Sequence, residues 1–89
     1  MHVSVRLFSH LRLALGKRSL EMELPEGATV ADVMERMRML TGPEVDSMIV
    51  GGTEGGYRLV MLVNDRRSQA DCILREGDVI SLLPPLGGG

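Results

Sequence analysis

The chain has 89 residues, a formal net charge of −2 and a sequence pI near 5.6, values that fit one domain with one hydrophobic core. This balance provides no basic field for nucleic acid or an anionic membrane, and one Tyr, one Phe and no Trp provide no base-stacking platform. A chain of this length has little room for both a substrate pocket and a full catalytic apparatus, so we expect it to act through partner proteins.

Side chains that could carry chemistry are few. Cys72 is the only cysteine and precedes Ile73 and Leu74, so we expect a small core residue in a reducing compartment. His2 and His10 do not have the spacing of a metal-ligand pair, and no metal site is predicted. No window approaches the roughly 20 apolar residues of a membrane span, and no signal sequence opens the chain, which predicts a cytoplasmic protein.

Polar and apolar residues alternate over residues 2–7, the period of a half-buried strand. Val3, Val5 and Leu7 should face the core. Phe8 has the opposite parity, so we expect the only Phe at the outer face or the rim of the sheet.

A short helical turn should follow over residues 10–15, capped by Ser9 and ended by Gly16, with Arg12 projecting from it. Residues 18–24 alternate again and should form an antiparallel hairpin with the first strand. The residues that should point inward there are Leu20, Met22 and Leu24.

Thr29 and Asp32 have the spacing of a capping box, with Asp in place of the usual Glu, and open the one clear helix, which Gly42 and Pro43 end. Apolar residues recur at helical spacing along it, and we interpret this Met-rich stripe as core packing. They are Val30, Val33, Met34, Met37 and Leu40.

Residues 44–50 are compatible with a short helix or an extended segment, and residues 51–56 should form a mobile glycine-rich loop. Tyr57 stands where a phosphate-binding loop would carry its lysine, so no nucleotide site is predicted. The nearly continuous apolar run over 57–63 predicts a central strand covered on both faces.

Asn64 and Asp65 should turn the chain into a short strand within 66–69, and a last strand should span 78–83. The resulting order of strands and helix predicts an α+β fold of the β-grasp, ubiquitin-like type. In this fold a mixed sheet has one main helix packed on one face.

The domain should therefore occupy residues 1–83, followed by an extended tail over 84–89. Pro84 and Pro85 prevent further strand pairing and hold the base of the tail extended. Six extended residues reach roughly 20 Å, far enough to enter another protein's active site. Leu86 is followed by Gly87, Gly88 and Gly89, and glycines pass through a narrow channel.

Three segments together resemble the MoaD/ThiS family of ubiquitin-like sulfur carriers, in particular the small subunits of molybdopterin synthase. These are the strand that ends in Val63-Asn64, the Gly77-Asp78 before the last strand, and Pro84 to Gly89. The resemblance spans nearly the whole chain, and the longer glycine-rich segment 44–56 departs from it.

The resemblance implies a non-catalytic carrier that binds no cofactor. An adenylating enzyme of the ubiquitin-activating type (MoeB- or ThiF-like) would use ATP to adenylate Gly89, which a sulfur donor would convert to a thiocarboxylate. The tail would then enter the large subunit of molybdopterin synthase (MoaE-like) and donate sulfur for the molybdenum or tungsten cofactor. Partner contacts are implied at Phe8 and Leu83, with Arg12 nearby, although burial of Leu83 within the domain is the other interpretation.

Two alternatives stay open at this point. A related carrier could serve thiamine synthesis or tRNA thiolation, or the chain could be a protein modifier that joins Gly89 to a lysine. The chain could also be a β-grasp binding module with an inert tail, since chain ends are commonly disordered.

Overall fold

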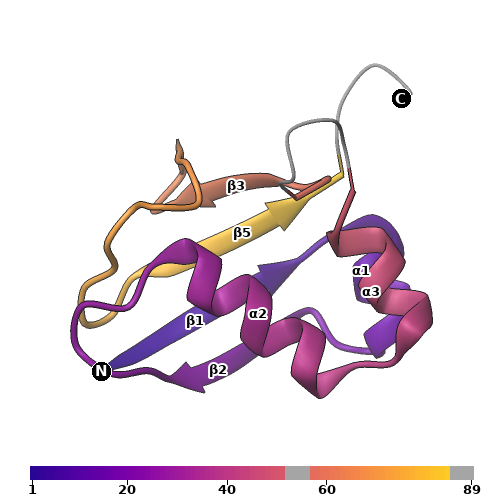
Figure 1. Cartoon of the computed structure of the whole chain (residues 1–89), viewed down its shortest axis with the longest axis horizontal. Coiled ribbons are helices and arrows are strands. Elements are labelled where there is room, and N and C mark those ends of the chain that lie inside the picture. Colours follow the sequence, from indigo (N-terminus) through magenta and orange to yellow (C-terminus); the bar gives the residue numbers. More distant parts are fainter. Residues whose placement is uncertain (52–56, 85–89) are drawn as a thin grey trace.

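The computed structural model describes residues 1–51 and 57–84 of the chain. The helices and strands within these residues follow one another as shown in Figure 1. They are β1 (His2–Leu7), α1 (Ser9–Leu15), β2 (Ser19–Glu23), α2 (Val30–Leu40), α3 (Pro43–Ile49), β3 (Val60–Val63), β4 (Arg66–Arg67) and β5 (Val79–Leu83).

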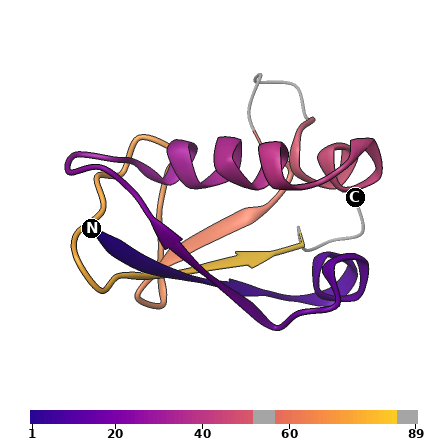
Figure 2. The same ribbon diagram turned by 90° about the horizontal axis from the view of Figure 1, so that it is seen from below.

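The five strands form one mixed sheet in the order β2-β1-β5-β3-β4. β1 is antiparallel to β2 and parallel to β5, while β3 is antiparallel to both β5 and β4. Figure 2 shows α2 lying in a layer across one face of this sheet. The predicted β-grasp fold, with a mixed sheet and one main helix on one face, is therefore confirmed.

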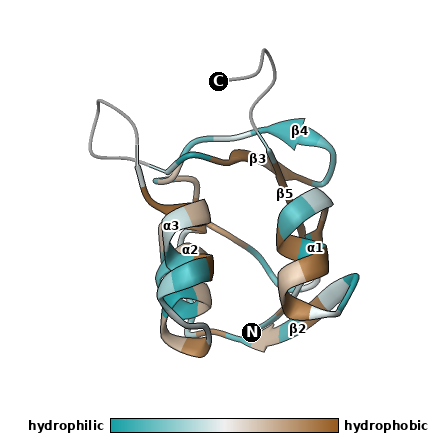
Figure 3. Cartoon of the chain, turned by 90° about the vertical axis from the view of Figure 1, so that its right-hand side faces the viewer, coloured by the Kyte–Doolittle hydropathy of each residue, from teal (hydrophilic) through white to brown (hydrophobic). Residues whose placement is uncertain are grey.

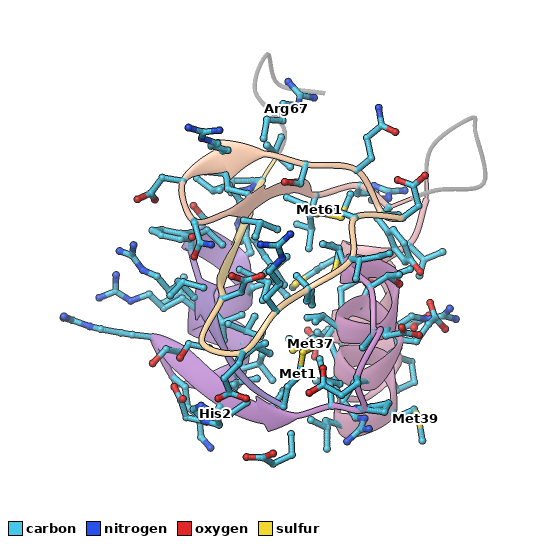
Figure 4. All side chains as sticks on the ribbon, turned by 90° about the vertical axis from the view of Figure 1, so that its left-hand side faces the viewer. Met1, His2, Met37, Met39, Met61 and Arg67 are labelled. Atoms are coloured by element: carbon cyan, nitrogen blue, oxygen red, sulfur yellow. The ribbon has the colours of Figure 1, made fainter. Side chains whose placement is uncertain are left out.

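The core lies between α2 and the sheet. Val3, Val5 and Leu7 of β1 are at most 2% exposed, as their parity predicts. From the helix, the stripe residues Val30, Val33, Met34 and Met37 are all fully buried. In Figure 4, Met37 points into this interior and Met39 of the same helix points to solvent.

Leu40 was expected in the same stripe, and that prediction is wrong, because its side chain is 65% exposed. At 3.6 residues per turn, position 40 drifts to the side of a stripe that is centred between Val30 and Met37. The helix also ends directly afterwards, at Thr41, whose backbone is extended.

Capping interactions at the ends of α1 and α2 can be compared with those expected from the sequence. The backbone N–H of Asp32 donates to Thr29 Oγ1 (3.4 Å), and the N–H of Thr29 donates to the Asp32 carboxylate (2.7 Å), which confirms the capping box of α2. Ser9 does not cap α1. That helix already begins at Ser9, and Phe8 is the N-cap residue, without a side-chain cap. At the other end Gly16 adopts a left-handed conformation (φ 67°), and its N–H donates to the carbonyl of Arg12.

The segment after α2 contains a third helix and a strand shorter than expected. Residues 43–49 form the helix α3, with Pro43 in its first turn, where a missing N–H is tolerated. The strand predicted over 57–63 is shorter, and it is neither central nor covered on both faces. All four residues of β3 are half-buried, β5 is the middle strand, and α2 covers only one face. β4 confirms the short strand predicted after the Asn64 turn.

Cys72 was expected in the core, but it is only half-buried and packs against the core from outside. In the part of the chain that the structure describes, no helix is long and apolar enough to cross a membrane.

Candidate functional site

The residues that carry the family resemblance brace the start of β5. Asn64 Nδ2 donates to Asp78 Oδ1 (2.8 Å), and Asn64 Oδ1 accepts from the backbone N–H of Val79 (3.0 Å). The other Asp78 oxygen accepts from the N–H of Arg75 (2.8 Å). These side chains fix the strand that leads to the tail, so their contribution is to position and not to react.

The register of β5 determines which of its leucines belongs to the core. Leu82 pairs with Leu7 of β1 and is fully buried under the helices. Leu83 pairs with Val60 of β3 and has the opposite parity, so it lies on the face that α2 leaves open, where it is half-buried.

Phe8 and Leu83 lie at the same end of this open face. Leu7 and Leu82 form the last pair between the parallel strands β1 and β5. Phe8 follows Leu7 directly and Leu83 follows Leu82 directly, so both lie just beyond this pair. Both are half-buried, and half-buried Pro84 follows directly. The structure thus brings together two of the three predicted partner-contact residues and the first residue of the predicted tail.

Figure 1 shows that β1 and β5 run side by side toward the end of the molecule where α1 lies. Figure 3 views this end directly, with α1 on one side and α2 with α3 on the other, and with hydrophilic and hydrophobic bands along α1. Arg12 projects from α1 and is exposed, as predicted. The remaining tail positions, Pro85, Leu86, Gly87, Gly88 and Gly89, lie outside the described residues.

A groove of about 470 Å³ opens between α1, β1 and β2, beside Phe8. We call it the arginine groove, because its lining includes Arg6, Arg12 and Arg18 as well as Phe8, Ser19 and Glu21. The Arg6 guanidinium carbon lies 5.4 Å from the centroid of the Phe8 ring, within cation–π range. Sequence reasoning found Phe8 and Arg12 but missed Arg6 and Arg18.

A second polar cluster lies on the helix side of the molecule. Arg38 of α2 contacts Glu35 of the same helix and Asp46 of α3, and the hydroxyl of Tyr57 donates to Glu35 (2.8 Å). Hydrogen bonds to Asp46 and then Glu35 raise the pKa of Arg38. Burial, followed by the hydrogen bond to Glu35, raises the pKa of Tyr57 from 10.0 to about 12.

We call these four residues the α2–α3 clamp. The clamp joins α2 and α3 to Tyr57, which lies shortly before β3 in the chain. Tyr57 also forms an isolated bridge with Val50, directly after α3. It holds no free acid or base, because each polar group has a partner, and we assign it a structural role. Within residues 1–51 and 57–84, no group of three His, Cys, Asp or Glu side chains could hold a metal ion.

Comparison with known proteins agrees with this geometry. A family profile described as the ThiS family matches residues 5–89. A solved structure named as a putative molybdopterin converting factor, subunit 1, from Pyrococcus furiosus is 32% identical, with a TM-score of 0.79, and the match covers 97% of this chain and 99% of that one. No curated protein sequence matches the chain.

Two further solved structures, each less than 25% identical, share the fold. SAMP1 from Haloferax volcanii has a TM-score of 0.82 at 24% identity, with both chains fully covered. A complex of subunits 1 and 2 of the molybdopterin-converting factor from Helicobacter pylori has a TM-score of 0.63 at 22% identity, also over both full chains. Because the family profile covers nearly the whole sequence and the fold agrees, the chain belongs to the ThiS family of ubiquitin-like sulfur carriers and modifiers.

Proposed function

We propose that this protein is the sulfur-carrying small subunit of a molybdopterin synthase and that Gly89 is its reactive residue. The observation that carries the proposal is the 32% identity, over nearly the full length, to a protein whose name is putative molybdopterin converting factor, subunit 1. A braced final strand that ends at Leu83, close to Phe8, supports it, because a carrier must present its tail from a rigid base.

The chemistry takes place in partner proteins. A carboxylate is a poor electrophile, so the adenylating enzyme first joins the Gly89 carboxylate to AMP from ATP, with loss of pyrophosphate. Hydrosulfide supplied by a sulfur donor then attacks the acyl carbon, a C–S bond forms as the bond to AMP breaks, and the sulfur loses its proton. The resulting thiocarboxylate carries a nucleophilic sulfur that the synthase large subunit can direct to a pterin precursor. This chain contributes the carboxyl group and the surface that positions it.

Docking of that surface must precede the chemistry. Phe8 and Leu83 provide half-buried apolar area next to Pro84, and Arg12 provides a charge nearby. Apolar anchors surrounded by polar residues are typical of the centre of a protein interface. We assign partner contact to Phe8, Leu83 and Arg12 on this basis.

The test is intact-mass measurement after incubation with the adenylating enzyme of the same organism, ATP and a sulfur source. We expect the mass gain of one oxygen-to-sulfur exchange. A variant that lacks Gly88 and Gly89 should show no gain and should unfold at the same temperature as the parent, because the buried core of the described residues extends from Val3 to Leu82. Loss of cooperative unfolding in that variant would contradict the proposal.

A second candidate is a protein modifier. The full-length structural similarity to SAMP1 favours it, because the Haloferax volcanii protein is named small archaeal modifier protein 1. In that case the same incubation in the presence of cell proteins should give isopeptide adducts at lysines. A thiocarboxylate that transfers its sulfur to a pterin precursor on the large subunit favours the carrier. An unchanged mass in every reaction would leave only a binding module.

A further inference from the structure

Charge is unevenly distributed over the surface of this chain. Besides the arginine groove, a second groove of about 240 Å³ lies along α1, and its lining comprises Arg12, Leu13, Gly16, Lys17 and Arg18. The two grooves share Arg12 and Arg18, so they form one continuous surface. Within residues 1–51 and 57–84, four Lys and Arg side chains line it, against one carboxylate. A chain of net charge −2 therefore has a cationic surface here.

The cations of this surface are available to a partner. Among residues 1–51 and 57–84, the ion pairs are His2–Glu21, Arg38–Glu35 and Arg38–Asp46, and none involves a guanidinium of the arginine groove. The one carboxylate of the groove is already engaged, because Glu21 accepts from Ser4 Oγ (3.0 Å) and lies 2.8 Å from His2 Nε2.

The groove also has some preorganisation. The stacking of Arg6 on Phe8 directs one guanidinium over the groove without neutralising it. Arg12 comes from a short helix whose end Gly16 fixes, and Leu13, which is 80% exposed, adds an apolar contact beside it. Ordering these groups in advance lowers the entropic cost of binding.

We propose that the arginine groove docks a carboxylate-rich segment of the large subunit that receives the tail. This inference rests on the proposed function and adds the chemistry of the partner's contact. Guanidinium forks bind carboxylates in a two-pronged geometry, and an apolar side chain between the carboxylates would contact Leu13 or Phe8. Opposite charges at the rim of an interface mainly accelerate association and set orientation.

A protein carboxylate fits this surface better than nucleic acid does. Phe8 is the only Phe, and no second aromatic lines the groove, so successive bases would find no stacking platform. The overall negative charge of the chain would also oppose a polyanion that extends past the groove.

The first experiment tests the groove without the large subunit. A short synthetic peptide of glutamates around one leucine is titrated into the isotopically labelled protein, and amide NMR shifts are followed. We expect shifts concentrated at Arg6, Phe8, Arg12 and Arg18 that weaken with added salt, and none with a matched lysine peptide. Shifts scattered over all arginines, no shifts, or tighter binding of a single-stranded RNA oligomer of equal charge would overturn the proposal.

The second experiment measures affinity for the large subunit of the same organism. The double variant Arg12→Glu/Arg18→Glu should bind about tenfold or more weakly at low salt, with a smaller difference at high salt, mainly through slower association. The control is Arg66→Glu, the same charge reversal on the opposite edge strand, β4, which should bind like the parent. Thermal unfolding confirms that both variants fold.

The outcomes separate the two proposals. If the parent protein forms no thiocarboxylate while the acidic peptide still maps to the groove, the proposed function fails and the groove remains a carboxylate site. If the thiocarboxylate forms and the parent binds the large subunit but the double variant binds equally well, the sulfur-carrier function stands, and the docking role of the groove and the partner contact assigned to Arg12 are both wrong.

Discussion

Leu82 and Leu83 are adjacent, chemically identical and differently used. Leu82 faces α2 and is fully buried, whereas Leu83 lies on the face of the sheet opposite α2 and is half-buried beside Pro84. The same division separates Leu7, which is 2% exposed, from half-buried Phe8. One face of the sheet therefore supplies the stability of the domain, and the open face leaves apolar area for a partner. A shift of one residue along a strand is enough to move a side chain from the buried face of the sheet to the open face.

The strongest test of this comparison is a truncation on the helix-covered face. Leu82→Ala should lower the free energy of unfolding by about 2–5 kcal/mol, because it leaves a cavity in a packed core. Urea denaturation of the parent and the variant measures the difference. The matched control is Leu83→Ala, one residue further along, which removes the same atoms from a half-buried site and should cost clearly less. Equal losses at both positions would show that the open face is also core.

The next test reverses the comparison and addresses partner binding. Leu83→Asp and Phe8→Asp should each weaken binding to the large subunit by about tenfold or more, equivalent to roughly 1.4 kcal/mol, since a charge would be buried at the centre of the interface. Their effect on unfolding should be smaller than their effect on binding. Calorimetric titration gives the affinity, and thermal unfolding gives the stability. Unchanged affinity in both variants contradicts the assignment of this surface.

A smaller effect is expected at the start of the covering helix. Thr29→Ala should destabilise the domain by about 1 kcal/mol, because the N–H of Asp32 loses its side-chain acceptor and the capping box is broken. Thr29→Ser retains the hydroxyl and should restore most of the loss. Neither variant should change affinity for the large subunit, which separates the helix layer from the docking face once more.

Local sequence patterns predicted several parts of the fold correctly. The alternation of Val3, Val5 and Leu7, the hairpin that follows and the capping box of α2 all depend on residues close in sequence. Where the outcome depended on tertiary packing, prediction was wrong or incomplete. The run over 57–63 looks equally apolar whether one face or two are covered, so only the sheet order reveals that β3 lies next to the edge strand.

The candidate site divides in the same way. Phe8 could be found from its parity and Leu83 from the family resemblance, because Phe8 directly follows β1 and Leu83 is the last residue of β5. The arginine groove could not be found, since Arg6, Arg12 and Arg18 come from β1, α1 and the turn before β2 and meet only after folding. The link between Tyr57 and Glu35 was missed for the same reason, as the two residues are far apart in sequence.

The smallest effect on stability at neutral pH is expected at Tyr57, on the helix side of the molecule. Its ionisation can be measured directly. Its pKa is raised to about 12 from 10.0, chiefly by burial and then by the hydrogen bond to Glu35. Because the folded value is the higher one, the associated stability is fully present below pH 10 and is lost as the pH rises toward 12. Since Tyr57 is the only Tyr and no Trp is present, phenolate absorbance reports this ionisation alone.

We expect a midpoint near pH 12 in the folded protein, and Glu35→Gln should move it part of the way toward 10, because the charge is removed while the burial remains. Tyr57→Phe should flatten the dependence of stability on pH across the same interval. A folded midpoint near 10 would mean that the clamp does not hold the phenol. Glu35→Gln should bind the large subunit at neutral pH like the parent, because Glu35 belongs to the helix that covers the opposite face of the sheet from Phe8 and Leu83.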